Sequence, residues 1–248
     1  MKCWSFAGLF AGLAFAALAS SAVAAEVKIL SAGAVEPGVR AVAAAYERAT
    51  GNTASFTFNT APGIRKRIDA GEAWDVVIAP PAVLDEYANI GKLTGPRASL
   101  GRVGLGVAVR PGAPVPDISS SAALKQSILG ADSLVFNRAS TGLYLETLLK
   151  RMGIAEQVAA KSTRYPDGAA VMDHLSKGSG NEIGFGAMTE ILLSKDNGVR
   201  LVGPLPPDVQ NYTSYTAVAS SSAEAQAFVR YLGNPNAKAL ISAAGIEP

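Results

Sequence analysis

Four short turns in this sequence are rich in glycine and small polar residues. Each precedes a predicted helix, and the first three also follow a predicted strand. They are residues 31–38, 59–63, 137–142 and 165–168. In a parallel α/β sheet such turns lie at the carboxyl ends of the strands, where ligands bind. The helix N-termini there offer unpaired N–H groups and a positive dipole end. Any one turn is equally well explained as an ordinary connection, but four together predict a cleft for a small anion.

Three arginines near these turns are candidate contacts for a carboxylate. Arg138 lies inside the third turn, just before Ser140 and Thr141. A tetrahedral oxyanion can be bound without arginine, whereas a di- or tricarboxylate usually needs one or two. Arg65 and Arg67 lie in the first turn of a predicted helix, and a solvated basic face explains them better than ligand contact.

Other kinds of chemistry have little support in the sequence. His174 is the single histidine and Cys3 the single cysteine, so a transition-metal site of usual make-up is not expected. The G-x-S-x-G pattern of a nucleophile elbow is absent. The pair Gly104 and Gly106 lacks the third glycine of a dinucleotide fingerprint. The net charge of +2 argues against nucleic acid as the main partner. We therefore expect no cofactor, no metal and no nucleic acid.

The elements that position the turns alternate between strand and helix. Short β-leaning runs are followed by segments with apolar residues at helical spacing, an order that predicts an α/β fold with mostly parallel sheets and covered faces. The opening units are a strand at 27–31, a helix at 39–49, a strand at 56–58, a helix at 65–70 and a strand at 75–79.

Two proline-rich stretches mark internal boundaries, at residues 111–116 and 204–208. Between them lies a complete α/β block, and the strand predicted at 212–219 returns to the first part of the chain. We therefore expect two lobes, the first from residues 25–108 and 209–248 and the second from 109–208. A cleft between such lobes takes a small ligand and closes by hinge motion.

Residues 1–24 read as an export signal. Lys2 precedes an apolar run from Phe6 to Leu18, and Ala22-Val23-Ala24 forms a small-residue cleavage site. The rival interpretation is a membrane anchor, but the run falls short of the roughly 20 residues that a spanning helix needs. We expect cleavage of this signal and a periplasmic protein.

Several stretches resemble the periplasmic molybdate-binding proteins of ABC importers. They include ILSAGAVEPGVRAVAAAYERATG, FNTAPGIRKRIDAGEAWDVVIAP and STGLYLETLLKRMGI, and the similarity covers nearly all of the chain after the signal. The resemblance implies the two-lobed type II periplasmic binding protein fold and an oxyanion held by hydroxyls and backbone N–H groups. It also implies a monomer that delivers its ligand to an ABC permease.

Carried over residue by residue, the resemblance implies ligand contacts in all four turns. Three places depart from the family. Ala34 stands where a serine is usual, the second turn is serine-rich in the family but has Thr60 as its one hydroxyl here, and Phe185-Gly186 occupies the region of the family's tyrosine. These departures leave the identity of the anion open. The expected ligand-binding residues are Gly33, Ala34, Thr60, Ala61, Arg138, Ser140, Thr141, Asp167 and Gly168.

Two alternatives to a transport receptor stay open. One is an enzyme on the same scaffold, because the chain also looks similar to aconitate isomerase, an exported enzyme that acts on a tricarboxylate. Such an enzyme needs a general base and cationic clamps, and Asp167, Tyr165 and Arg138 are the groups that the turns offer. The other is a sensor or receptor without a transporter partner.

Overall fold

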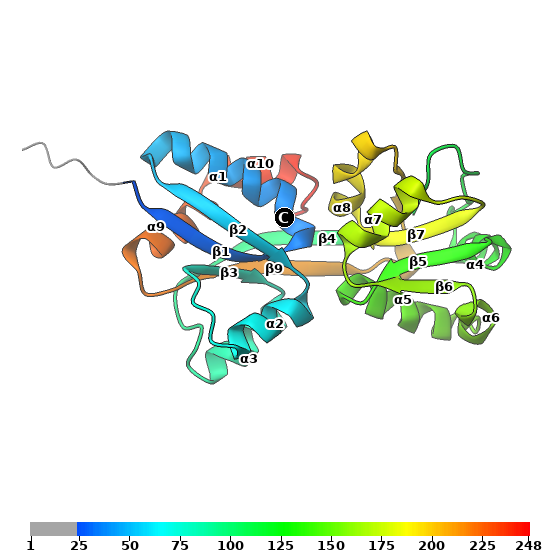
Figure 1. Ribbon diagram of the computed structural model, residues 1–248, viewed down its shortest axis with the longest axis horizontal. Helices are drawn as coiled ribbons and strands as arrows, with labels where there is room; N and C mark the ends of the chain where they lie inside the picture. The colour runs from blue at the N-terminus through cyan, green and yellow to red at the C-terminus, as the bar shows by residue number, and fades with distance from the viewer. Residues whose placement is uncertain (1–23) are drawn as a thin grey trace, which may run out of the picture.

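The computed structural model describes residues 24–248, and within them the strands form one nine-stranded sheet with helices on its faces (Figure 1). Residues 1–23 of the predicted export signal lie outside the described residues. No described helix is both long and apolar enough to cross a membrane.

The elements fall into three runs along the chain. The first run is β1 (Glu26–Ala32), η1 (Gly33–Val35), α1 (Glu36–Thr50), β2 (Thr53–Asn59), α2 (Ala61–Asp69), β3 (Val76–Ala79) and α3 (Pro81–Asn89). The second run is β4 (Arg97–Val109), α4 (Ser121–Gly130), β5 (Ser133–Asn137), α5 (Ser140–Arg151), α6 (Ala155–Ala159), β6 (Ser162–Tyr165), α7 (Gly168–Lys177), β7 (Glu182–Ala187) and α8 (Met188–Leu193). The last run is η2 (Lys195–Asn197), β8 (Arg200–Pro204), η3 (Pro207–Val209), β9 (Tyr212–Ala219), α9 (Ala223–Leu232) and α10 (Pro235–Ala243).

The sheet has the strand order β2-β1-β3-β9-β4-β7-β5-β6, with β8 also paired to β4. The pairs β1/β2, β1/β3, β5/β6 and β5/β7 are parallel, whereas every pair that involves β4 or β9 is antiparallel. The long strand β4 joins the two halves, because residues 97–104 pair with β9 and residues 105–109 pair with β7. The predicted α/β class is confirmed, with antiparallel strands where the halves meet.

Buried apolar residues form one cluster in each half and a smaller third cluster. The first cluster draws on residues 27–103 and 215–246, together with Ala187 of β7, so both ends of the described chain build it. The other two draw on residues 105–205. We call the half around the first cluster lobe 1 and the other half lobe 2. In Figure 1 the blue, cyan and orange-to-red elements make lobe 1, and green and yellow elements make lobe 2. The residue boundaries given above for the lobes stay a prediction.

Local sequence explains why the helices begin at the turns. Thr60 caps α2 by accepting a hydrogen bond from the backbone N–H of Gly63, and Asp167 caps α7 by accepting one from Ala170. In α1 the apolar positions at helical spacing, such as Val39, are buried against the sheet. These caps place both helix starts at the carboxyl ends of β2 and β6.

Candidate ligand-binding cleft

A small chamber lies where the carboxyl ends of the strands of both lobes meet. Its volume is about 30 Å³, which is room for roughly two water-sized groups. We call it the inner chamber. Its lining is Ala32, Gly33, Ala34, Asn59, Thr60, Ala61, Pro80, Asn137, Ala139, Ser140, Thr141, Gly168, Ala187, Glu190 and Tyr215.

The structure brings most of the predicted site residues together around this chamber. Asp167 lies just outside it, where it caps α7. Arg138 is exposed and lines no part of the cleft in the described structure. The predicted residues that line the inner chamber are Gly33, Ala34, Thr60, Ala61, Ser140, Thr141 and Gly168.

Helix starts from both lobes surround the inner chamber. The first residues of α2, α5 and α7 are Ala61, Ser140 and Gly168, and all three line it. The short η1 turn at Gly33 leads into α1 from the same side. Because the first N–H groups of a helix have no partner within the helix, several donors converge on one small space. Such an arrangement can hold an anion without a lysine or arginine.

Two asparagines that sequence reasoning did not single out fix the turns of the two lobes. Asn59 ends β2, and its side-chain oxygen accepts from the backbone N–H of Thr60 at 2.9 Å. Asn137 ends β5, and its side-chain oxygen accepts from the backbone N–H groups of Ala139 and Gly142. Both asparagines line the inner chamber. Their common position, as the last residue of a strand before a helix, is a signal that the sequence contained.

The hydroxyl groups of the turns are engaged to different degrees. Thr141 exchanges hydrogen bonds with the Asn137 amide at 2.8 and 3.1 Å, so its hydroxyl is held in place. Thr60 accepts the capping N–H of Gly63 at 3.4 Å, a long contact. Ser140 makes no side-chain hydrogen bond within the described residues, and its hydroxyl is therefore the best placed of the three to meet a ligand.

Glu190, the third residue of α8, is the acidic group of the inner chamber and was not predicted from sequence. Its carboxyl group lies between the two lobes: a Cβ built on Gly33 would stand 3.3 Å from Oε1, and one on Gly168 would stand 2.0 Å from Oε2. Glycine at both positions thus makes room for this carboxyl group.

The surroundings of Glu190 favour its protonated form. Burial is the main cause, and the negative charges of Asp167 and Glu36 add to it, while the backbone N–H of Ala187 works in the opposite direction. Together they raise the pKa of Glu190 to about 7. A carboxyl group that titrates near neutral pH inside a cleft is a candidate for exchanging protons with a ligand.

Tyr215, on β9, also lines the inner chamber, and only 5% of its surface is exposed. Burial raises the pKa of its hydroxyl, and the Glu190 carboxylate raises it further. Tyr215 therefore stays a neutral phenol near Glu190. The resemblance implied a tyrosine near Phe185, but Phe185 itself is buried in the core of lobe 2 and does not line the chamber. The tyrosine that lines the chamber is Tyr215, from a different strand.

A second chamber adjoins the first, with a volume of about 170 Å³. We call it the outer chamber. Two of the acids that line it already have partners, because Glu36 pairs with Arg40 at 2.7 Å and Asp167 caps α7. Its lining is Gly33, Glu36, Phe58, Asn59, Thr60, Asp167, Ala169, Glu190, Leu193 and Ser194.

The two lobes touch each other beside the inner chamber. The hydroxyl of Thr189 on α8, fully buried, donates a hydrogen bond to the backbone carbonyl of Ala34 in η1. Thr189 directly precedes Glu190, so one short helix makes both the contact between lobes and the acidic wall of the chamber.

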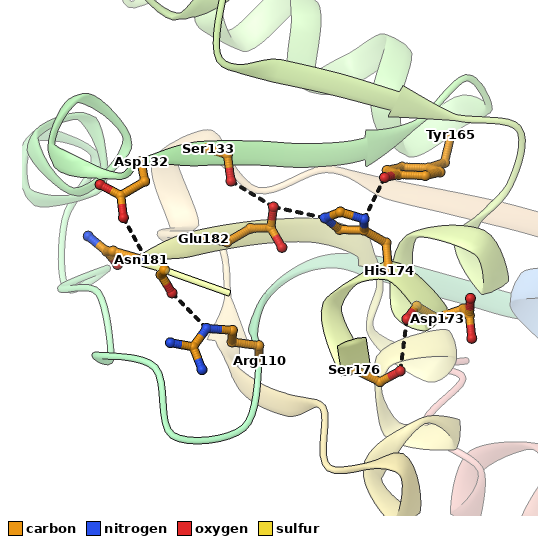
Figure 2. A network of polar contacts seen from close by, with 10 residues as sticks. Arg110, Asp132, Ser133, Tyr165, Asp173, His174, Ser176, Asn181 and Glu182 are labelled. Atoms are coloured by element: carbon orange, nitrogen blue, oxygen red, sulfur yellow. Dashed lines mark hydrogen bonds and ion pairs between the residues drawn. The ribbon is translucent and has the colours of Figure 1, made fainter. Parts of the chain in front are cut away.

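Tyr165, one of the general bases considered from sequence, points away from the cleft. Its hydroxyl lies 2.6 Å from Nδ1 of His174, and Nε2 of His174 lies 2.9 Å from Glu182 Oε1 (Figure 2). A carboxylate only accepts, so the Nε2–H of His174 donates to Glu182. Ser133 donates to the same carboxylate oxygen at 2.6 Å. Among the described residues there is no group of three or more His, Cys, Asp or Glu placed to hold a metal ion.

Comparison with known proteins adds to this geometry. The sequence profile of the family described as "Bacterial extracellular solute-binding protein" matches residues 27–247. The chain belongs to this family. Aconitate isomerase from Pseudomonas sp is 32% identical over 234 residues, which is 89% of this chain and 87% of that protein.

Solved structures agree in fold. The periplasmic molybdate-binding protein of Azotobacter vinelandii aligns with a TM-score of 0.74 and 18% identity, over 90% of this chain and 99% of that one. PEB3, known from Campylobacter jejuni and solved with L-phospholactate, aligns with a TM-score of 0.69 and 14% identity, over 90% of this chain and 99% of that one. The predicted resemblance to molybdate-binding-like solute-binding proteins is thus confirmed.

Proposed function

We propose that this protein captures a small anion in the cleft between its lobes. The observation that carries the proposal is the convergence of the first residues of α2, α5 and α7 on one small chamber. Their backbone N–H groups and dipole ends compensate negative charge without a cationic side chain. No lysine or arginine is among the described residues that line either chamber.

The setting we propose is capture for ABC-type import. In this setting the exported chain works as a monomer in the periplasm, and a permease in the inner membrane takes the ligand from it. In the proposed closed form the hydrogen bond from Thr189 of lobe 2 to the Ala34 carbonyl of lobe 1 holds the lobes together. Family membership supports this setting.

The charge of Glu190 affects which class of anion the cleft can bind. A fully ionised molybdate, tungstate or sulfate would meet its carboxylate at close range, and like charges at such distances repel strongly when partly buried. A carboxylate ligand meets the same repulsion unless one proton is shared between it and Glu190. Because a 32% identical relative is an aconitate isomerase, we propose small carboxylates ahead of metal oxyanions.

Calorimetric titration tests the proposal. We expect at least one of acetate, succinate, aconitate, phosphate, sulfate, molybdate and tungstate to bind with a stoichiometry of one, and its presence to raise the melting temperature by mass action. If every one of these anions gives neither heat nor a thermal shift at millimolar concentration, anion capture is wrong.

A second candidate is an aconitate-isomerase-like enzyme, favoured by Glu190 beside Tyr215 and by the 32% identical relative. In this scheme the ionised Glu190 removes a proton from a carbon next to a carboxylate-bearing double bond. The electron pair of that C–H bond moves the double bond by one position, and Glu190 returns the proton to the far carbon. The step is balanced and needs no oxidant or reductant.

Proton NMR of cis- and trans-aconitate in D₂O decides between the candidates. An isomerase interconverts the two and incorporates deuterium, and Glu190→Gln lowers the rate about 10²-fold or more. If the wild-type protein binds aconitate without interconversion above the buffer rate, the enzyme candidate is removed and the receptor stands.

A further inference from the structure

The two chambers lie next to each other. They share four lining residues, Gly33, Asn59, Thr60 and Glu190. Glu190 thus stands at the junction, with the helix starts of the inner chamber on one side and the outer chamber on the other. A ligand that enters the inner chamber must extend past Glu190 if it is longer than a single anionic group.

The chambers differ in size and chemistry. The inner one, about 30 Å³, suits a carboxylate-sized group, whereas the outer one is about 170 Å³. The outer walls include the partly buried ring of Phe58 and Leu193, which is 55% exposed. Ala169, the second residue of α7, lines the outer chamber with only a methyl side chain. A half-exposed leucine and an aromatic ring facing the same space offer contacts to a carbon chain that a tetrahedral oxyanion could not use.

We propose that the ligand is an elongated organic acid that spans both chambers. One carboxylate lies in the inner chamber among the helix starts, the carbon skeleton lies in the outer chamber against Phe58 and Leu193, and Glu190 faces the ligand where the chambers join. This inference rests on the proposed anion capture and adds the shape and class of the ligand.

A series of straight-chain carboxylates tests the proposal, with acetate, butyrate and hexanoate as probes. Each methylene that enters the outer chamber is expected to raise the affinity about threefold to fourfold, so hexanoate should bind at least about tenfold tighter than acetate. Calorimetry measures each affinity on the full chain.

Ala169→Trp fills the outer chamber and should remove the advantage of hexanoate while leaving acetate unchanged. The matched control is Ala122→Trp, because Ala122 is also the second residue of its helix, α4, and is also exposed, but lines neither chamber. In the control variant the affinity should still rise with the length of the carboxylate, as in the wild-type protein. If Ala169→Trp fails to fold by circular dichroism, Leu193→Ser replaces it and should weaken hexanoate a fewfold more than acetate.

The outcomes separate this inference from the proposed function. If acetate or sulfate binds and hexanoate binds no tighter, anion capture stands but the two-chamber ligand is wrong. If Ala169→Trp lowers the affinities for acetate and hexanoate equally, the two-chamber ligand is also wrong. If none of the anion panel and none of the three carboxylates binds, both this inference and anion capture fail.

Discussion

Two glutamates on consecutive elements of lobe 2 have opposite surroundings. Glu182, at the start of β7, is 4% exposed, and its Oε1 accepts hydrogen bonds from Ser133 and His174 (Figure 2). Its Oε2 has no hydrogen-bond partner among the described residues. Glu190, at the third position of α8, has only the backbone N–H of Ala187 to favour its charge, and it faces the chamber between the lobes.

The difference predicts a structural role for Glu182 and a role in ligand binding for Glu190. Removing Glu182 leaves two polar side chains without their acceptor, so Glu182 holds β5, β7 and α7 together. Glu190 does not link elements in this way, and its raised pKa means that burial in the folded protein disfavours its ionised form. Protein sites that keep such a group commonly use it on a ligand.

The largest expected effect is on the stability of the Glu182 network. Glu182→Ala should lower the free energy of unfolding by about 3 kcal/mol, because it orphans Ser133 and His174. Urea denaturation followed by circular dichroism measures the change. Ser133→Ala, which removes one donor, should cost about 1 kcal/mol. Equal losses in the two variants would show that the carboxyl group is not the centre of the network.

Glu190→Gln should raise the free energy of unfolding, and the increase should depend on pH because the pKa of Glu190 is raised. Because the folded-state pKa of about 7 lies above the ordinary value of 4.5, the folded protein is favoured by protonation and loses this stability as the pH rises through about 7. After discounting for partial solvent access, the variant should be more stable than wild type by about 1–2 kcal/mol near pH 8.

Near pH 4, below the ordinary pKa of 4.5, the same difference should shrink to under about 0.5 kcal/mol, because Glu190 is then mostly protonated in both the folded and the unfolded protein. Urea denaturation at the two pH values checks this. A variant that is less stable than wild type near pH 8 would mean that the Glu190 carboxylate has a stabilising partner, and the contrast with Glu182 would disappear.

Anion affinity should show the same titration. Acetate is fully ionised above about pH 6, so if its carboxylate shares a proton with Glu190, wild-type affinity falls about tenfold per pH unit above pH 7. The affinity of Glu190→Gln should change little over that range. Calorimetry at constant ionic strength provides both profiles, and parallel profiles would exclude Glu190 as the group that titrates.

The smallest effect is expected at Arg138. This side chain is exposed and lines neither chamber, and salt screens exposed charges beyond about 8 Å under physiological conditions. Arg138→Gln should therefore change anion affinity by less than about twofold in calorimetry at that ionic strength. A tenfold loss would instead place Arg138 over the bound ligand, as the sequence interpretation allowed.

The sequence was most informative about backbone geometry. Turns, caps and the alternation of strand and helix are local properties, and they predicted where Gly33, Thr60, Ser140 and Gly168 would meet. The strand β6 was not predicted, because Ser162–Tyr165 has no alternating apolar pattern and is fixed by its pairing with β5.

The acidic wall of the cleft could not be predicted from local pattern. Glu190 lies in a segment that reads as an ordinary amphipathic helix, and only the contact of α8 with η1 turns it toward the chamber. Tyr215 is separated by some 25 residues from Glu190 in the sequence, and the two are brought together by the antiparallel return of β9. Such neighbours depend on long-range pairing.

The position of β9 in the sheet has a consequence for the order of assembly. Because β9 lies between β3 and β4, the sheet of lobe 1 stays interrupted until residues 212–219 are available for pairing. Lobe 2 draws its core from one uninterrupted stretch and can complete it earlier. The candidate cleft is therefore completed last, when the final fifth of the chain adds Tyr215 and β9 fills the gap between β3 and β4.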